Sequence, residues 1–414
     1  MVEDAQGQKA PSQQFVDRFS RYYAPAVILA ACLVAILPPL VLKQPFNHWF
    51  YQALGMLLVA CPCALVISTP VAIVSAIGSA ARQGVLIKGG VYLEEMGEIT
   101  AIAFDKTGTL TRGEPELTDL IALHGSEEEA LSLAAAIERR SEHPLAQAIV
   151  NYAQKQAVPL LEMQNFQAVA GRGAYADLAG QRYYIGNLRF FEEQQRSLLN
   201  EARQTAEKLQ NEGKTVMLMG DEQRLLAMLA VADVLRENSA AQIGSLKRLG
   251  MKKVIMLTGD NERTARAIAN KAEVDEYRAG LLPEDKLNVI KDLLEQDHKV
   301  VMVGDGVNDA PALAMATVGI AMGAAGTDTA LETADIALMA DDLSKVAYTI
   351  DLGRRTLNII KQNIAFSLLV KASVLLMVIP GWLTLWLAVL GDMGTSLLVT
   401  LNGMRLLSSK HKNF

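Results

Sequence analysis

Hydrophobic residues gather in four long segments, two toward each end of the chain. The segments run from about Pro25 to Leu42, Tyr51 to Ile77, Ile364 to Ile379 and Leu383 to Leu401. Each approaches or exceeds the roughly 20 apolar residues that a helix needs to cross a hydrocarbon core of about 30 Å. The pattern therefore predicts four transmembrane helices, arranged as two pairs and surrounded by membrane lipid.

Lysine and arginine residues flank these segments on one predicted side. They form four clusters: Arg18 and Arg21, Arg82 and Lys88, Arg354, Arg355 and Lys361, and Arg405, Lys410 and Lys412. The two short loops on the other side carry only Lys43. Because positively charged loops stay in the cytoplasm, we expect both termini and the large middle block to be cytoplasmic. The expected location is a bacterial cytoplasmic (inner) membrane, with soluble domains in the cytoplasm.

The middle block, about residues 86–345, is polar, and short apolar runs in it alternate with helical patterns. The runs expected as strands are Ile99–Phe104, Lys253–Leu257, Lys299–Val303 and, in an inserted unit between Glu114 and about Ala232, Thr215–Met219 and Ala227–Val231. Strands that alternate with helices indicate a doubly wound parallel sheet, which binds ligands at the carboxyl ends of its strands. The predicted fold class is therefore α/β plus membrane α-helical.

Composition narrows the class of protein further. The chain has 414 residues, enough for two or three domains, and 51% of them are hydrophobic. A mean hydropathy of +0.19 argues against a purely soluble or disordered chain. The net charge of −6 gives no support for a nucleic-acid partner. Two of the three cysteines, Cys61 and Cys63, flank a proline in an apolar segment and are interpreted as ligand or core thiols rather than bridges.

Several motifs in the middle block carry groups suited to phosphoryl transfer. Asp105, in Asp-Lys-Thr-Gly-Thr-Leu-Thr, directly follows a predicted strand, where an aspartate can attack a phosphate and form an aspartyl phosphate. Thr258 offers a hydroxyl and Lys286 a positive charge. Asp305 and Asp309 offer hard oxygens for Mg²⁺. The alternative is that such aspartates only cap the following helices.

These motifs resemble the phosphorylation domain of P-type ATPases. The resemblance rests on Asp105–Thr111, Thr258–Asp260 and Gly304–Asp309 followed by Ala310-Pro311. It implies a haloacid-dehalogenase-like fold that uses ATP and Mg²⁺. It also assigns roles to individual residues: Asp105 would be phosphorylated, Asp105, the Thr107 carbonyl and Asp305 would hold Mg²⁺, Asn308 and Asp309 would order the loop, and Asp233 and Arg236 would form the hinge to the inserted unit.

The inserted unit carries Ser141-Glu142-His143-Pro144 and Gly171-Arg172-Gly173. Alone, each motif has a structural explanation, since a single histidine or Gly-x-Gly is common in folded domains. In this order they resemble the nucleotide-binding signature of the heavy-metal branch of P-type ATPases. The resemblance implies an inserted α+β nucleotide-binding domain. There Glu142 and His143 would lie against adenine, while Gly171 and Gly173 would let the backbone approach the nucleotide.

The second apolar segment is interrupted by Cys61-Pro62-Cys63. A proline inside a helix removes one N–H and unwinds a turn, so the two thiolates can point to one soft metal ion. The alternative is that both cysteines simply pack as small apolar residues.

Two charged residues, Lys371 and Asp392, fall inside the third and fourth segments. Each costs about 3 kcal/mol or more in lipid, so we expect both to face the bundle interior. Asp392-Met393-Gly394-Thr395-Ser396 with Asn402 and Arg405-Leu406-Leu407 resembles the last span of zinc/cadmium/lead-exporting ATPases. That resemblance implies Asp392 as a ligand of the transported Zn²⁺, Cd²⁺ or Pb²⁺ and Lys371 as its counter-ion. An ion pair that only holds two helices together stays the alternative.

A Cu⁺ exporter is a second reading of the transport site. The copper branch would place Met and Ser-Ser in the last span and Tyr-Asn in the preceding one. Met393 and Ser396 match the first pattern only in part, and the Tyr-Asn pair is missing. A carboxylate beside two thiolates also suits a divalent ion better than Cu⁺.

The resemblance predicts the following domains: residues 1–24 a cytoplasmic linker, 25–85 and 351–407 the helix pairs, 86–113 and 233–350 the phosphorylation domain, 114–232 the nucleotide-binding domain and 408–414 a tail. It covers only the C-terminal part of the family's architecture, since the sequence contains no Thr-Gly-Glu loop of an actuator domain. Three readings stay open: a non-pumping membrane-anchored remnant, a fragment, or one half of a pump whose actuator half is separate.

Overall fold

A computed structural model describes residues 10–59, 63–141, 143–159, 161–169, 171–194, 199–296, 298–305, 309–323 and 332–408 (the described residues). The chain divides into two units. The membrane unit comprises Met1–Thr100, Leu293–Val301 and Leu313–Phe414, and the middle unit comprises Ala101–Asp292 and Met302–Ala312. The domain boundaries expected from the sequence stay predictions.

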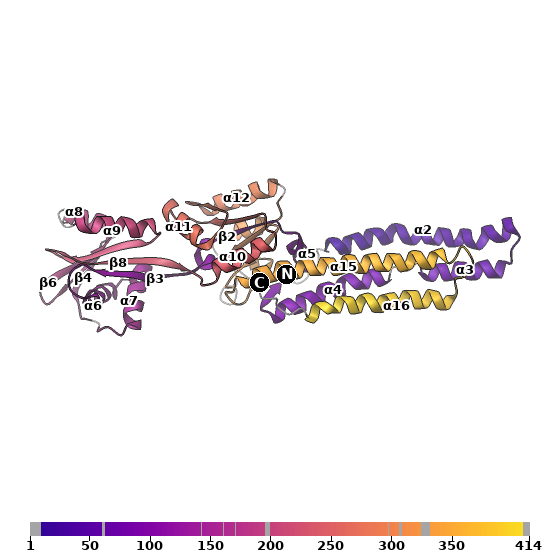
Figure 1. The fold of residues 1–414 in the computed structure, drawn as a ribbon, viewed down its shortest axis with the longest axis horizontal. Helices are drawn as coiled ribbons and strands as arrows, with labels where there is room; N and C mark the ends of the chain where they lie inside the picture. The colour runs from indigo at the N-terminus through magenta and orange to yellow at the C-terminus, as the bar shows by residue number, and fades with distance from the viewer. Residues whose placement is uncertain are drawn as a thin grey trace. The chain divides into compact units, whose positions relative to one another are not determined.

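Long apolar helices dominate the membrane unit (Figure 1). They are α2 (Pro11–Leu42), α3 (Phe46–Val59), α4 (Cys63–Arg82), α15 (Ser344–Leu376) and α16 (Leu385–Met404), the last followed by the 3₁₀ turn η3 (Arg405–Ser408). Among the described residues, four helical stretches are long and apolar enough to cross a membrane, with α3 and α4 forming one of them. The four predicted spans are therefore confirmed.

Two of the membrane helices are longer than the apolar pattern indicates. Helix α2 begins at Pro11, so residues 11–24, expected as a linker, already continue the first span. The local sequence explains this early start. Pro11 lies in the first turn of the helix, where proline is tolerated, and no glycine or further proline occurs before Pro25. Helix α15 likewise begins at Ser344, twenty residues before the predicted third segment.

Small residues and amides join the membrane helices. A Cβ on Gly403 of α16 would lie 3.4 Å from the backbone nitrogen of Ala72 in α4, so these two helices are in close contact. Asn402 of α16 donates to Asn363 Oδ1 of α15 at 2.9 Å, and Asn363 donates to the Val399 carbonyl at 3.1 Å. Close backbone approach and side-chain hydrogen bonds are the usual means by which helices associate in lipid.

The α/β part contains a seven-stranded sheet with the order β1-β13-β12-β11-β2-β9-β10. The strands are β1 (Val85–Ile87), β2 (Ala101–Asp105), β9 (Lys253–Leu257), β10 (Glu276–Arg278), β11 (Val300–Gly304), β12 (Val318–Ala321) and β13 (Ile336–Leu338). Strands β2, β9 and β10 pair in parallel, as do β12 and β13, whereas the edge strand β1 pairs antiparallel with β13. The predicted parallel sheet is confirmed, with an antiparallel edge.

Helices and one irregular turn complete this part of the chain. They are α5 (Gly90–Glu98), the turn η1 (Lys106–Leu110), α10 (Ser239–Arg248), α11 (Glu262–Ala272), α12 (Pro283–Glu295) and α13 (Ala310–Met315). Strand β2 is buried at all five positions. It therefore delivers its last residue, Asp105, to the carboxyl edge of the sheet from a rigid support.

The inserted unit is built on a separate antiparallel sheet with the order β3-β8-β7-β6-β5-β4 (Figure 1). Its strands are β3 (Thr111–Ala122), β4 (Gln164–Val169), β5 (Gly173–Leu178), β6 (Gln181–Gly186), β7 (Thr215–Asp221) and β8 (Leu225–Leu235). Its helices are α6 (Glu127–Glu138), α7 (Pro144–Lys155), α8 (Leu188–Gln194) and α9 (Leu199–Asn211).

Alternation along the central strands builds two cores in this unit. In β7, Met217 and Met219 pack with α6 and α7, whereas Val216 and Leu218 pack with α8 and α9. Since successive side chains of a strand point to opposite faces, helices cover both sides of the sheet. This explains why β7 and β8 read as nearly continuous apolar runs in the sequence.

Candidate active site and metal site

The side chains predicted for phosphoryl transfer meet at the end of β2. Asp105 is only 5% exposed, and its Oδ1 lies 2.6 Å from Nζ of Lys286, near the start of α12. The same ammonium lies 2.6 Å from Oδ1 of Asp309. The structure thus brings together three of the predicted catalytic residues, with one buried lysine between two buried aspartates.

The three charges do not balance one another. Burial, followed by the charge of Asp309, raises the pKa of Asp105 to about 6, although Lys286 opposes the change and Asp305 adds to it. Burial also raises the pKa of Asp309. Burial works against the charged form of Lys286, yet the charges of Asp105 and Asp309 raise its pKa above the usual value. Asp105 is therefore largely ionised at neutral pH, in a pocket with an excess of negative charge.

The backbone after Asp105 is held in an unusual conformation. Gly108 has a φ of 71°, which a residue with a side chain rarely adopts. Arg236, just beyond β8, donates from Nε to the Thr109 carbonyl and from Nη2 to the Gly108 carbonyl, both at 3.0 Å. Asp233 accepts from Thr111 Oγ1 at 2.6 Å and from the Gly113 N–H at 3.0 Å. The two residues expected at the hinge thus hold the loop that follows the aspartate.

Lys106 also has a place in the site, although sequence reasoning gave it no role. Lys106 is 6% exposed, and its ammonium pairs with Asp260 at 2.9 Å and Asp233 at 3.5 Å. The adjoining turn is closed by the Asp260 N–H, which donates to Oγ1 of the buried Thr258 at 3.1 Å. Lys106 therefore links the Thr258 turn to the hinge residue Asp233. Its position directly after Asp105 was the feature of the sequence that could have indicated this role.

The residues at these strand ends fit a magnesium ion that keeps part of its water. Asp105 and Asp305 follow β2 and β11, neighbours in the sheet, and the charge of Asp305 is close enough to raise the pKa of Asp105. Asp309 Oδ2 is buried and has no hydrogen-bond donor among the described residues. Within the same part of the chain no group of three or more His, Cys, Asp or Glu could hold a metal, so backbone carbonyls and water would complete the set. Asn308 lies outside the described residues.

In the inserted unit, a cavity of about 340 Å³ collects most of the nucleotide motif. His143 caps α7, and its Nδ1 accepts from the Leu145 N–H at 3.2 Å. With Nδ1 used as an acceptor, Nε2 carries the proton of the neutral ring and can donate to a ligand. Glu142, the other residue expected at adenine, lies outside the described residues.

Different structural constraints explain why each of the two positions in this motif is a glycine. Gly171 has a φ of 70° and open space where a Cβ would be. A Cβ on Gly173 would lie 2.1 Å from the Ile185 carbonyl oxygen, in the pairing of β5 with β6. Gly173 is thus required by the neighbouring strand as well, while its expected role beside the nucleotide stays a prediction.

Glu138 lines the same cavity and was missed in the sequence. It is the last residue of α6, is 4% exposed, and burial raises its pKa to about 7 against a hydrogen bond from Ser141. An acid at the C-terminal end of a helix faces the negative end of the helix dipole. That unfavourable placement was the signal that sequence reasoning passed over.

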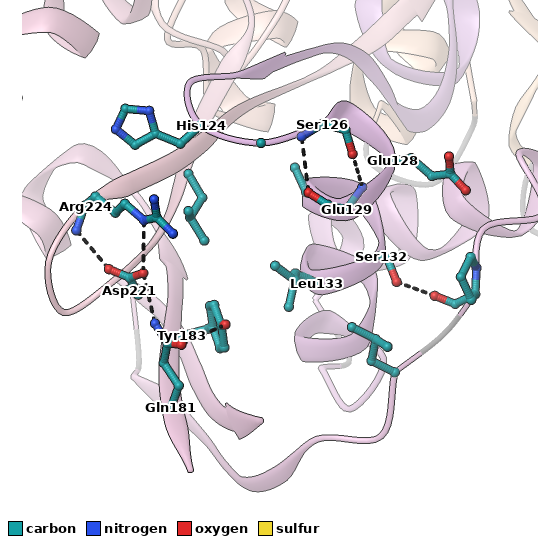
Figure 2. Close-up of a pocket in the computed structure, with 15 residues that line it drawn as sticks. His124, Ser126, Glu128, Glu129, Ser132, Leu133, Gln181, Tyr183, Asp221 and Arg224 are labelled. Carbon is teal, nitrogen blue, oxygen red and sulfur yellow. Dashed lines mark hydrogen bonds and ion pairs between the residues drawn. The ribbon is translucent and has the colours of Figure 1, made fainter. Parts of the chain in front are cut away.

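A larger cavity, about 650 Å³, lies elsewhere in the inserted unit. Figure 2 shows that some of its polar groups bond to one another: Asp221 accepts from Gln181 Nε2 at 3.0 Å and from the Arg224 N–H at 2.9 Å. Ser126 and Glu129 form a reciprocal capping box at the start of α6. None of the predicted site residues lines this cavity, so we do not assign the nucleotide to it.

In the membrane unit, Lys371 of α15 lies 3.3 Å from Asp392 Oδ1 of α16, with side chains 6% and 17% exposed. The pair therefore faces the bundle interior, as the cost of a charge in lipid requires. Cys63 is the first residue of α4, whereas Cys61 lies outside the described residues. Cys63 is disulfide-bonded in the structure, which differs from the expectation of unbridged thiols. The metal ligand is the free thiolate, so ligation by Cys63 requires its reduced form.

Comparison with known proteins agrees with this architecture. Residues 99–317 match the haloacid dehalogenase-like hydrolases. The chain is 54% identical to a probable cadmium-transporting ATPase of Alkalihalophilus pseudofirmus, covering 99% of this chain and 57% of that protein. It is 46% identical to a zinc/cadmium/lead-transporting P-type ATPase of Escherichia coli, covering 98% and 54%. The chain thus spans little more than half the length of these curated relatives.

A solved structure extends the likeness to three dimensions. The crystal structure of a zinc-transporting PIB-type ATPase matches with a TM-score of 0.88 and 45% identity, covering 98% of this chain and 66% of that one. The match spans both the α/β part and the membrane helices. It confirms the predicted fold class, including the haloacid-dehalogenase-like sheet.

Proposed function

Since the chain belongs to the heavy-metal P-type ATPases, whose catalytic domain is haloacid dehalogenase-like, we propose that it forms the catalytic and transport part of an ATP-driven metal exporter. The observation that carries the proposal is the Lys286 ammonium held 2.6 Å from both Asp105 and Asp309 at a strand end. The cargo we propose is a divalent soft ion, Zn²⁺, Cd²⁺ or Pb²⁺. A carboxylate in the membrane, Asp392, favours such an ion over Cu⁺.

In the proposed reaction, a carboxylate oxygen of Asp105 bonds to the terminal phosphorus of ATP. The bond from that phosphorus to the bridging oxygen breaks, and ADP leaves with the electron pair. Lys286 offsets the repulsion between the two anions and remains paired with Asp309 when the charge of Asp105 is consumed. When bound, Mg²⁺ would supply further neutralisation of the transferring group from Asp105, the Thr107 carbonyl and Asp305.

We place the adenine of ATP in the 340 Å³ cavity of the inserted unit. His143 would donate from Nε2, and Gly171 leaves open space beside the backbone. Glu138 would form the buried polar end of the cavity. Thr258, whose hydroxyl is held by its own turn, would contact the phosphoryl oxygens.

In the membrane, reduced Cys61 and Cys63 with Asp392 would bind the cargo. Lys371 holds Asp392 at 3.3 Å in this structure, so an arriving cation competes with an ammonium for the same carboxylate. We further propose, from the resemblance to the family, that turnover requires an actuator part. We also propose that the pump resides in a bacterial cytoplasmic membrane.

Acid-quenched labelling tests the proposal. The reduced protein in lipid nanodiscs, given radiolabelled ATP, Mg²⁺ and Zn²⁺, is expected to form an acid-stable, hydroxylamine-labile adduct. Asp105→Asn should form none while still binding ATP. Asp292→Asn, an exposed acid on α12, is the matched control and should label normally. Label that persists on Asp105→Asn would rule out Asp105 as the nucleophile.

A further inference from the structure

Three buried hydroxyl groups in the membrane unit have no role in the site described above. Ser68 and Thr69 of α4 and Ser367 of α15 are 0%, 1% and 0% exposed. None of their oxygens has a hydrogen-bond partner among the described residues. A buried hydroxyl without a partner is unfavourable, and three such groups in adjacent helices call for a polar occupant.

Other hydroxyls in α15, and one in the neighbouring helix α16, behave differently. In α15, Thr356 donates to the Leu352 carbonyl at 2.8 Å and Ser373 to the Leu369 carbonyl at 2.9 Å. In α16, Thr395 donates to the Gly391 carbonyl. Bonding to the carbonyl four residues earlier is the usual way in which serine and threonine are satisfied inside a helix. Ser68, Thr69 and Ser367 do not use it, so their oxygens stay available.

Contacts between the helices place these hydroxyls at one depth. The Asn363–Asn402 hydrogen bond joins α15 to α16, and the next residue of α16, Gly403, packs on Ala72 of α4. From that level, Ser367 lies four residues further along α15, and Ser68 lies four residues back along α4. In both helices these four residues correspond to about one turn, a rise of about 6 Å along the helix axis.

Another four residues along α15 is Lys371, the partner of Asp392. The hydroxyls therefore lie between the Lys371–Asp392 pair and the Asn363–Asn402 pair. They are on the side of Lys371 that faces the expected cytoplasmic end of α15. The result is a band of neutral oxygens one turn below the charged pair.

We propose that Ser68, Thr69 and Ser367 form a waypoint for a partly hydrated divalent metal cation between the cytoplasm and Asp392. Hydroxyl oxygens can replace water in the shell of the ion, and they add no negative charge that would trap it. Binding at such a step should be weak, so its effect is on the rate at which the ion reaches Asp392. The inference rests on the proposed transport function.

The test uses labelled Cd²⁺ and the reduced protein in nanodiscs, with Cys32→Ser as the background because Cys32 is an exposed free thiol. Thr69→Val removes the hydroxyl at nearly constant shape, whereas Thr69→Ser keeps it. We expect Thr69→Val and Ser367→Ala to slow Cd²⁺ association about fivefold, at unchanged final stoichiometry. Thr69→Ser should associate at the wild-type rate. Ser367→Ala, on a different helix, provides a second measurement if Thr69→Val does not fold.

The outcomes separate the two proposals. Association at the wild-type rate in Thr69→Val and Ser367→Ala, with binding that still depends on Asp392, overturns the waypoint and leaves the transport function standing. A wild-type protein that binds Cd²⁺ no better than Asp392→Ala overturns the proposed divalent cargo, on which this inference rests, and favours Cu⁺. An equal slowing in Thr69→Val and Thr69→Ser assigns the effect to packing and also overturns the waypoint.

Discussion

Two buried lysine–aspartate pairs, one at a sheet edge and one between membrane helices, use the same contact for different purposes. Lys286 bridges two carboxylates at 2.6 Å each, whereas Lys371 lies 3.3 Å from Asp392. In both pairs the proposed reaction needs the aspartate to bond something else, a phosphorus atom or a metal ion. In each pair the lysine supplies a positive charge beside a carboxylate that is taken out of water.

The difference lies in what happens to each lysine afterwards. Lys286 retains Asp309 when Asp105 reacts, so it can stay and stabilise the transferring group. In the proposed function, Lys371 would compete with the cation for Asp392, the carboxylate that it contacts at 3.3 Å. We infer that removing Lys286 harms phosphorylation, whereas removing Lys371 strengthens metal binding. Removing one lysine should therefore impair its site and removing the other should strengthen its site, and this opposite effect is the sharpest test of the comparison.

The largest effect is expected for Lys286→Ala. It leaves Asp105 and Asp309 buried beside each other without their shared ammonium, a change that typically destabilises a domain by about 3–5 kcal/mol. We also expect phosphoenzyme formation to slow by about 10²–10³-fold, since a preorganised positive charge is lost. Quenched-flow labelling and calorimetric melting measure the two effects. Lys291→Ala, an exposed lysine on α12, is the control, and near-normal labelling of Lys286→Ala would break the comparison.

At the membrane pair we expect opposite changes from the two partners. Asp392→Ala removes a ligand and should weaken Cd²⁺ binding about tenfold or more. Lys371→Met keeps the length of the side chain without its charge and should tighten binding by about tenfold, because no ammonium then competes for Asp392. Equilibrium dialysis under reducing conditions measures both. Weaker binding in Lys371→Met would assign the pair a purely structural role, and an indifferent Asp392→Ala would favour Cu⁺.

The raised pKa of Asp105 predicts a moderate effect of pH. Its folded value of about 6 lies above the usual 3.8, so the folded state binds the proton more tightly than the unfolded state. The contribution of Asp105 to stability therefore falls as pH rises from about 4 to 6. Phosphorylation needs the ionised carboxylate, so its rate should rise through pH 6 and level off above it. Asp309→Asn removes a nearby charge and should move the midpoint to lower pH; an unmoved midpoint would contradict the electrostatic cause.

The parts of the fold that could be predicted from the sequence are those with a regular pattern of apolar residues. Strand β9 occupies the predicted residues Lys253–Leu257, because a short apolar run between turn residues specifies a buried strand. The extension of α2 to Pro11 was missed, since a polar helix that continues a membrane span carries no apolar signal of its own. The antiparallel edge strand β1 was missed because three residues are too few to show a pattern.

The candidate site divides in a similar way. Motif residues such as Asp105 and Lys286 are separated by 181 positions, yet strand ends and parallel pairing bring them to one edge. What the sequence could not supply is burial, which raises the pKa of Glu138 and leaves the Ser367 hydroxyl without a hydrogen-bond partner among the described residues. Both properties depend on contacts between distant segments, and no local pattern records them.

The smallest effect concerns Glu138, a buried acid whose described partner is a hydroxyl rather than an ammonium. Without a lysine, burial is expected to neutralise the carboxyl, and a bound nucleotide would bury it further. ATP binding should then take up a proton, so affinity should fall about three- to tenfold between pH 6 and pH 8. Glu138→Gln, which is neutral at every pH, should lose this part of the pH dependence in calorimetric titrations. Glu127→Gln, an exposed acid at the other end of α6, should keep it. The titration of ATP itself is common to all variants. Equal slopes in both variants would therefore show that Glu138 does not change its protonation when ATP binds, and would contradict this prediction.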